Sequence, residues 1–304
     1  MNAVTTSAYR QQSLNFSCEG QTLQAVLTLP SAPATSPGDL GVLVVVGGPQ
    51  YRAGSHRQFT LLARELARQG FPVLRFDHRG MGDSSGPLHD FKQITPDIGT
   101  AIEAFQSAHP GLRRVVIWGL CDAASAALMY WQRSRDPRIA GLCLLNPWVR
   151  SEASLAKATV KHYYLDRLKQ PEFWKKLLSG RVAGAALRDL IGNLRRARGA
   201  GAGTRAAASM NFQQEMALAW TELKSPLLLI LSGRDLTAKE FLEHAQADAA
   251  WQGLLQAPHV TRTDFPEADH TFSNAQARDQ VAQATAAWLC VKVNSSAAQV
   301  SARS

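Results

Sequence analysis

The residue best suited to do chemistry is Cys121, which lies in the stretch Gly119-Leu-Cys-Asp-Ala123. This small-x-nucleophile-x-small pattern is typical of a nucleophile elbow, a tight turn from a strand into a helix. Here Cys stands where Ser is more common, and Ala replaces the second Gly. Unpaired N–H groups at the start of a helix favour the thiolate, the attacking form of cysteine. The alternative is a buried core cysteine, because free cysteines are often buried.

Two further polar residues follow predicted strands, the first of which is an apolar run that predicts a buried strand. Asp235 comes after the run from 227 to 231 through a Gly-Arg turn, and His270 comes after the predicted strand from 259 to 264. In an open parallel sheet, active sites lie outside the carboxyl ends of the strands. There Asp235 could orient an imidazole and His270 could act as a general base. Alternatively, Asp235 only forms a turn, and His270 caps a helix or lies on the surface.

The three residues fall in the chain order nucleophile, acid, histidine, which is the order of the α/β-hydrolases. Their joint occurrence at three strand ends predicts a catalytic triad of Cys121, Asp235 and His270. An acyl-transfer site also needs N–H donors for the oxyanion. We expect these from Asp122, directly after the nucleophile, and from Gly48, because the following Pro49 has no N–H. The Asp122 carboxylate would oppose a neighbouring thiolate unless it turns away.

Strand-like and helical segments alternate from 40 to 145 and again after Pro226, which predicts right-handed crossovers and a parallel sheet. Before them, two β-rich stretches around Glu19-Gly20 predict an antiparallel hairpin. Between them, the composition is helical and rich in aromatic residues. The predicted divisions are a first core part (13–146), a helical cap (147–224), a second core part (225–290) and flexible tails (1–12 and 291–304).

The composition of the 304-residue chain, with 45% apolar and 19% charged residues, is that of a globular protein. No apolar stretch is long enough to span a bilayer and no signal peptide is evident, so a cytoplasmic location is expected. The four cysteines have neither CxxC spacing nor a His-rich neighbourhood, so we expect no metal site, no disulfide framework and no cofactor. Two of them, Cys143 and Cys290, have apolar surroundings typical of a core.

The net charge of +9 is concentrated in one segment. Residues 150 to 224 hold fourteen Lys and Arg against six Asp and Glu, a difference of +8. A basic cap of this kind would attract an anionic partner, such as an acyl chain on an acidic carrier protein, an acidic sugar polymer or an anionic membrane surface. The alternative is that the charge only keeps the helices soluble. Nucleic acid is not expected, because the aromatic residues are spaced as in a helical core.

The chain from about 20 to 290 resembles the α/β-hydrolases with a helical cap after the sixth strand. Its segment Asp77-His-Arg-Gly-Met-Gly-Asp-Ser84 matches a strand-end loop of that superfamily, which shapes the site without reacting. The segments from 46 to 56 and from 118 to 125 resemble the exosortase A system-associated hydrolases of type 1, from bacteria that make exopolysaccharide. The cysteine at 121 is similar to that of dienelactone hydrolases, and the 77–84 loop also occurs in the capped serine aminopeptidase-like branch.

Two classes of function are therefore open. The first is a hydrolase or acyl transferase in which Cys121 attacks an ester, thioester or lactone and forms a covalent acyl-enzyme; within the enzymes, a serine aminopeptidase-like peptidase is the alternative. The second is a non-catalytic binding module that uses its basic cap to dock an acidic partner.

Overall fold

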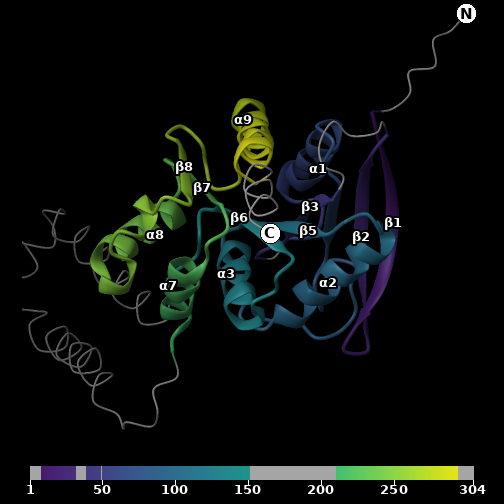
Figure 1. Cartoon of the computed structure of the whole chain (residues 1–304), viewed down its shortest axis with the longest axis horizontal. Coiled ribbons are helices and arrows are strands. Elements are labelled where there is room, and N and C mark those ends of the chain that lie inside the picture. The colour runs from purple at the N-terminus through teal and green to yellow at the C-terminus, as the bar shows by residue number, and fades with distance from the viewer. Residues whose placement is uncertain (1–7, 32–38, 49, 151–209, 294–304) are drawn as a thin grey trace, which may run out of the picture. The chain divides into compact units, whose positions relative to one another are not determined.

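The structure is a computed structural model, and it describes residues 8–31, 39–48, 50–150 and 210–293. Within these residues the centre of the fold is one sheet with the strand order β1-β2-β4-β3-β5-β6-β7-β8 (Figure 1). The strands are β1 (Tyr9–Cys18), β2 (Gln21–Pro30), β3 (Leu40–Val45), β4 (Val73–Phe76), β5 (Arg114–Leu120), β6 (Ile139–Leu145), β7 (Leu227–Ser232) and β8 (Val260–Phe265).

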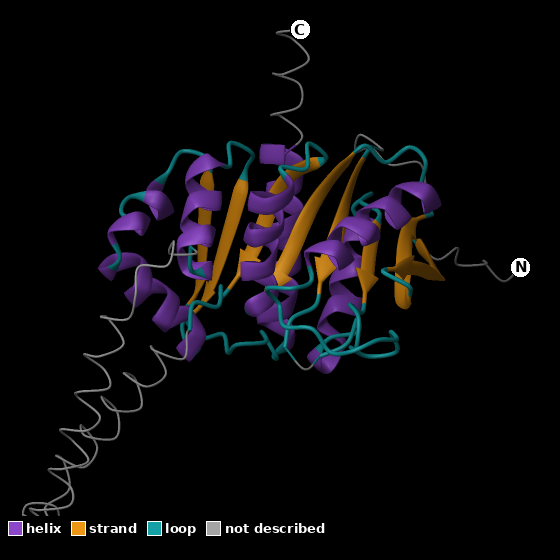
Figure 2. Ribbon diagram, turned by 90° about the horizontal axis from the view of Figure 1, so that it is seen from below, coloured by secondary structure: helices purple, strands orange, loops and turns teal. Residues whose placement is uncertain are grey.

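The sheet is antiparallel at one end and parallel from β4 to β8. Every residue of β3, β4 and β7 is buried, as expected for apolar strands covered on both faces. In Figure 2 these strands end at a common edge. The predicted N-terminal hairpin is confirmed, and it turns through Glu19 and Gly20, both with positive φ.

Helices cover both faces of the sheet. The helices are α1 (Gln58–Arg68), α2 (Thr95–Ala108), α3 (Asp122–Ser134), α7 (Phe212–Glu222), α8 (Leu236–Ala247) and α9 (Ala275–Trp288). Helices α1 and α9 pack on one face, and α2, α3, α7 and α8 pack on the other (Figure 1). Two hydrophobic layers therefore enclose the sheet, and both are built from described residues.

The structure differs from the expected divisions at three points, one of which is the C-terminal tail expected from 291, where the turn Leu289–Val293 buries Val293. Strand β1 begins at Tyr9, within the stretch expected to be a tail, and its first residues are exposed polar residues at the sheet edge. Helix α7, expected in the cap, belongs to the same compact unit as the sheet, whereas Arg150–Met210 form the second unit. Residues 151–209, which hold most of the predicted cap, lie outside the described residues, so the cap remains a prediction.

Two cysteines predicted to lie in the core have different surroundings. Cys143, on β6, is buried as predicted, but Cys290 is exposed, so that prediction was wrong. Helix α9 ends at Trp288, and the chain continues as a π-helical turn, Leu289–Val293. This turn buries Leu289 and Val293 and places Cys290 in solvent. The change of helical period explains why α-helical spacing misplaced this side chain.

Candidate active site

Cys121 lies at the turn between β5 and α3, where the chain is tightly constrained. Its backbone has φ 64° and ψ −126°, a conformation that non-glycine residues rarely adopt and that is typical of functional sites. The backbone N–H donates to Leu145 O at 2.8 Å. A Cβ on Gly119 would lie 2.6 Å from Ala123 O, which explains the glycine at this position. The strand–turn–helix that the sequence predicts around Cys121 is confirmed.

Asp235 and His270 follow the carboxyl ends of β7 and β8 and lie together. Asp235 is the N-cap of α8, and its two carboxylate oxygens accept the N–H groups of Thr237 at 3.0 Å and Ala238 at 3.2 Å. These bonds fix the carboxylate, which lies 2.8 Å from Nδ1 of His270. The Asp235 side chain is buried and the His270 ring is about one-third exposed.

The Cys121 side chain lies close enough to the His270 ring to influence its pKa, so the structure brings all three predicted residues together. The hydrogen bond with Asp235 and then the interaction with Cys121 raise the pKa of His270 to about 10, although burial opposes the shift. A ring with this pKa is protonated at neutral pH. The geometry can therefore hold an imidazolium between a carboxylate and a sulfur atom.

The N–H of Gly48, predicted as an oxyanion donor, already has a partner in the structure. It donates to Oδ2 of Asp122 at 3.0 Å. Burial raises the pKa of the Asp122 carboxyl, and the nearby N–H groups, first that of Gly48, oppose this shift. The sequence placed both residues at the site, but it gave no sign that the side chain of one would bind the amide of the other.

Asn146 is a site residue that sequence reasoning missed. It directly follows β6 with a positive φ of 44° and is fully buried. Its Nδ2 donates to Ser232 Oγ at 2.8 Å and to the His270 backbone O at 3.2 Å, and its Oδ1 accepts from Ser232 N at 2.9 Å. Asn146 thus ties the ends of β6 and β7 to the histidine loop. An Asn at the carboxyl end of a buried strand was the available signal.

The loop after β4 has the structural character that the sequence indicates. Asp77 is fully buried and its carboxylate accepts the N–H of Arg52 at 2.6 Å and that of Asp83 at 3.1 Å. The guanidinium of Arg52 also pairs with Asp77. A Cβ on Gly82 would lie 2.3 Å from the same carboxylate, so this position needs glycine. The buried aspartate therefore organises the loop through hydrogen bonds.

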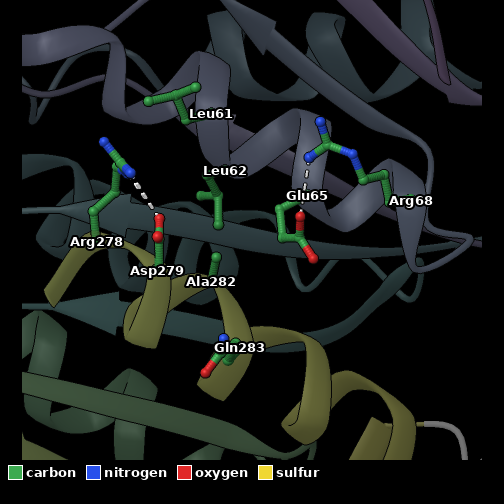
Figure 3. Close-up of a pocket in the computed structure, with 8 residues that line it drawn as sticks. All are labelled: Leu61, Leu62, Glu65, Arg68, Arg278, Asp279, Ala282 and Gln283. Atoms are coloured by element: carbon green, nitrogen blue, oxygen red, sulfur yellow. Dashed lines mark hydrogen bonds and ion pairs between the residues drawn. The ribbon is translucent and has the colours of Figure 1, made fainter. Parts of the chain in front are cut away.

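A groove of about 330 Å³ between α1 and α9 contains none of the predicted site residues (Figure 3). Its charged side chains pair locally: Arg68 lies 3.0 Å from Glu65, and Arg278 lies 2.9 Å from Asp279. No unpaired charge among these four residues is left to hold a polar ligand. The candidate chemistry therefore lies at the strand ends and not in this groove.

Two absences concern only the described part of the chain. It contains no group of three or more His, Cys, Asp or Glu side chains placed to hold a metal ion. None of its helices is long and apolar enough to cross a bilayer. The cytoplasmic location stays a prediction.

The sheet order, the helices on both faces and the strand–turn–helix at Cys121 define an α/β-hydrolase. Residues 41–274 match the family model described as serine aminopeptidase, S33 (Hydrolase_4), and the chain belongs to this family of enzymes. This match agrees with the occurrence of the 77–84 loop in the serine aminopeptidase-like branch. This chain has Cys at the position of the expected nucleophile. A comparison with curated protein sequences gives no match.

Several solved structures share the fold. The Pyrococcus furiosus esterase Pf2001 has a TM-score of 0.61 and 16% identity, over 94% of this chain and 92% of that one. An α/β serine hydrolase homologue from Coxiella burnetii has a TM-score of 0.55 and 13% identity, over 90% and 96%. The Pyrococcus horikoshii acylaminoacyl peptidase has a TM-score of 0.58 and 15% identity, over 95% of this chain but 42% of that one.

Proposed function

We propose that this α/β-hydrolase cleaves or transfers an acyl group held as an ester, thioester or lactone, with Cys121 as nucleophile. The observation that carries the proposal is the position of the His270 ring, which bonds Asp235 through Nδ1 and lies close enough to the Cys121 side chain to interact with it. A cysteine with only a structural role would not need a neighbouring histidine whose ring is bonded to a buried carboxylate. The combination is that of an activated nucleophile with an oriented proton carrier.

The reaction would begin with the sulfur as a thiolate beside the His270 imidazolium. Sγ attacks the carbonyl carbon, the C–S bond forms, and the carbonyl electron pair moves to oxygen. When the tetrahedral intermediate collapses, the bond to the leaving alcohol or thiol breaks, and His270 donates its proton to that group. Neutral His270 then takes a proton from water, or from an acceptor alcohol or thiol, whose oxygen or sulfur bonds the acyl carbon. The bond from that carbon to Sγ breaks, the acyl group leaves, and the thiolate beside the His270 imidazolium is restored.

The oxyanion of both intermediates would be held by the N–H groups of Asp122 and Gly48. The Asp122 amide comes directly after the nucleophile at the start of α3. The Gly48 amide is proposed from its position after β3, close enough to the elbow to bond the Asp122 side chain. Asp235 would not react but would keep the His270 ring oriented through the 2.8 Å bond to Nδ1.

The test is a panel of acyl thioesters, esters, lactones and aminoacyl amides with the wild-type protein and the variants Cys121→Ala and Cys121→Ser. We expect a covalent acyl adduct on Cys121, seen by intact-mass measurement. The Ala variant should lose at least about 10³-fold in turnover, as removal of a nucleophile generally does. Iodoacetamide should alkylate Cys121 well before the other three cysteines. Full turnover by Cys121→Ala on every substrate found would refute the proposal.

Two other functions compete with this one, and the same panel separates them. The family description names a serine aminopeptidase, and one structural neighbour is an acylaminoacyl peptidase; turnover of only the aminoacyl amides would favour a peptidase. A non-catalytic module would give neither turnover nor adduct, but would bind acidic partners through the basic segment. The exosortase A and exopolysaccharide link rests on the segments 46–56 and 118–125 and is proposed as context for the substrate.

A further inference from the structure

The Asp122 carboxylate sits against the loop that was expected to supply an oxyanion donor. Its Oδ2 accepts the Gly48 N–H at 3.0 Å. Its Oδ1 is buried and has no hydrogen-bond partner. A Cβ on Gly47 would lie 2.0 Å from that Oδ1, so the side chain fills the space between the end of β3 and the elbow. Acidic residues are common in the first turn of a helix. The side chain of Asp122 differs because it contacts the loop after β3.

A hydrogen-bond donor that is already paired cannot stabilise a developing charge without first losing its partner. The oxyanion is an anion, as is an ionised Asp122, and both would need the Gly48 N–H. Gly48 itself has open space around its Cβ position and φ 60°, so the amide is held by backbone conformation and by Asp122 and not by side-chain crowding. The two anions therefore compete for one donor.

We propose that Asp122 sets how readily the site accepts an oxyanion, because its carboxylate occupies the Gly48 N–H in the resting enzyme and must release it during acyl transfer. The inference rests on the proposed function. It makes Asp122 a determinant of which substrates react. A substrate must bind well enough through its other parts to displace the carboxylate, so simple activated esters react slowly.

The experiment compares Asp122→Ala with Asp122→Asn as a matched pair. Both variants remove the charge beside Cys121, but the Asn amide oxygen still reaches the Gly48 N–H and the Ala side chain does not. The probe is a trifluoromethyl ketone, which forms a tetrahedral adduct with a thiolate and needs an oxyanion donor. Iodoacetamide is the control, because it alkylates the same sulfur without forming an oxyanion.

We expect the trifluoromethyl ketone to bind Asp122→Ala at least about tenfold more tightly than Asp122→Asn, the size expected for freeing one hydrogen bond to a charged group. Iodoacetamide should alkylate Cys121 at similar rates in both. If Asp122→Ala does not fold, Asp122→Ser takes its place, since its hydroxyl is one bond shorter and suits the start of a helix.

Three outcomes would overturn the inference. Equal affinity of the two variants for the ketone would mean that occupancy of the Gly48 amide is irrelevant. Weaker binding by Asp122→Ala would mean that the carboxylate braces the loop in its productive position. A ketone that forms no adduct with Cys121 in the wild type or any variant, while iodoacetamide does alkylate it, would refute the proposed acyl transfer and this inference with it.

Discussion

At the scale of single residues, the protonation of His270 has the clearest measurable consequence. Its pKa is about 10 in the folded protein and 6.5 without these partners. The folded state therefore holds the proton more tightly than the unfolded state. The stability that this provides is fully present below pH 6.5 and is lost as the pH rises towards about 10.

We therefore expect the difference in melting temperature between wild type and His270→Gln to shrink between pH 6.5 and about 10. His259→Gln is the control, because burial lowers the pKa of His259 and its contribution should be constant above pH 6.5. The measurement is thermal unfolding at a series of pH values. A His270→Gln difference that stays constant across this range would show that the ring has no favourable proton-dependent contacts.

Some features of the candidate site could be predicted from the sequence and others could not. Cys121 and Asp235 could be found because each follows an apolar run, and His270 because it follows a predicted strand; parallel strands bring these carboxyl ends to one edge. The bond between Gly48 and Asp122 joins positions 74 apart. It depends on a side-chain rotamer and on a left-handed glycine, neither of which residue types reveal.

At the scale of elements, Asn146 links the ends of β6 and β7 to the loop that carries His270. Removing its side chain leaves buried partners unpaired, including the Ser232 N–H. We expect Asn146→Gly, which keeps the left-handed backbone, to lower the free energy of unfolding by about 2–3 kcal/mol. Asn146→Ala should cost roughly 1 kcal/mol more, because its φ is strained at this position.

Urea unfolding measures these stabilities, and the rate of Cys121 acylation measures the effect on the site. Both Asn146 variants should slow acylation, because the histidine loop loses an anchor. Ser232→Ala is the control, since it removes the Oγ acceptor but keeps the bond from Asn146 to the His270 carbonyl. If Ser232→Ala slowed acylation as much as Asn146→Gly, the contact with the histidine loop would not be the important one.

The parallel strands were the most predictable elements. The strands predicted at 227–231 and 259–264 match β7 and β8 to within one residue at each end, and the alternation predicted from 40 to 145 contains β3, β4, β5 and β6. The first residues of β1 were not predicted to form a strand, because they are polar and do not alternate with apolar residues. Gln11 in this part of β1 bonds Thr28 of the neighbouring strand β2. An edge strand held by backbone pairing lacks the apolar signal that reveals a buried one.

At the scale of the whole molecule, the net positive charge and the hydrophobic core come from different parts of the sequence. Residues 150–210 contain thirteen Lys and Arg against four Asp and Glu, a difference of +9 that equals the formal charge of the chain. The remaining residues are formally neutral and form the sheet with both of its hydrophobic layers. The residues on either side of the charged segment lie close together, because Gln213 Nε2 donates a hydrogen bond to the Val149 backbone O at 3.1 Å.

We therefore expect a chain in which a short Gly-Ser linker replaces residues 150–210 to fold, and to unfold cooperatively in urea.

Heparin, an acidic polysaccharide, should bind the full-length protein. This binding should weaken as salt is added, because salt shortens the range of electrostatic attraction, to about 8 Å at physiological ionic strength. The shortened chain should not bind it at any salt concentration. Equal binding by both chains would place the anion-attracting surface on the hydrolase core, and non-cooperative unfolding of the shortened chain would mean that the core depends on the segment.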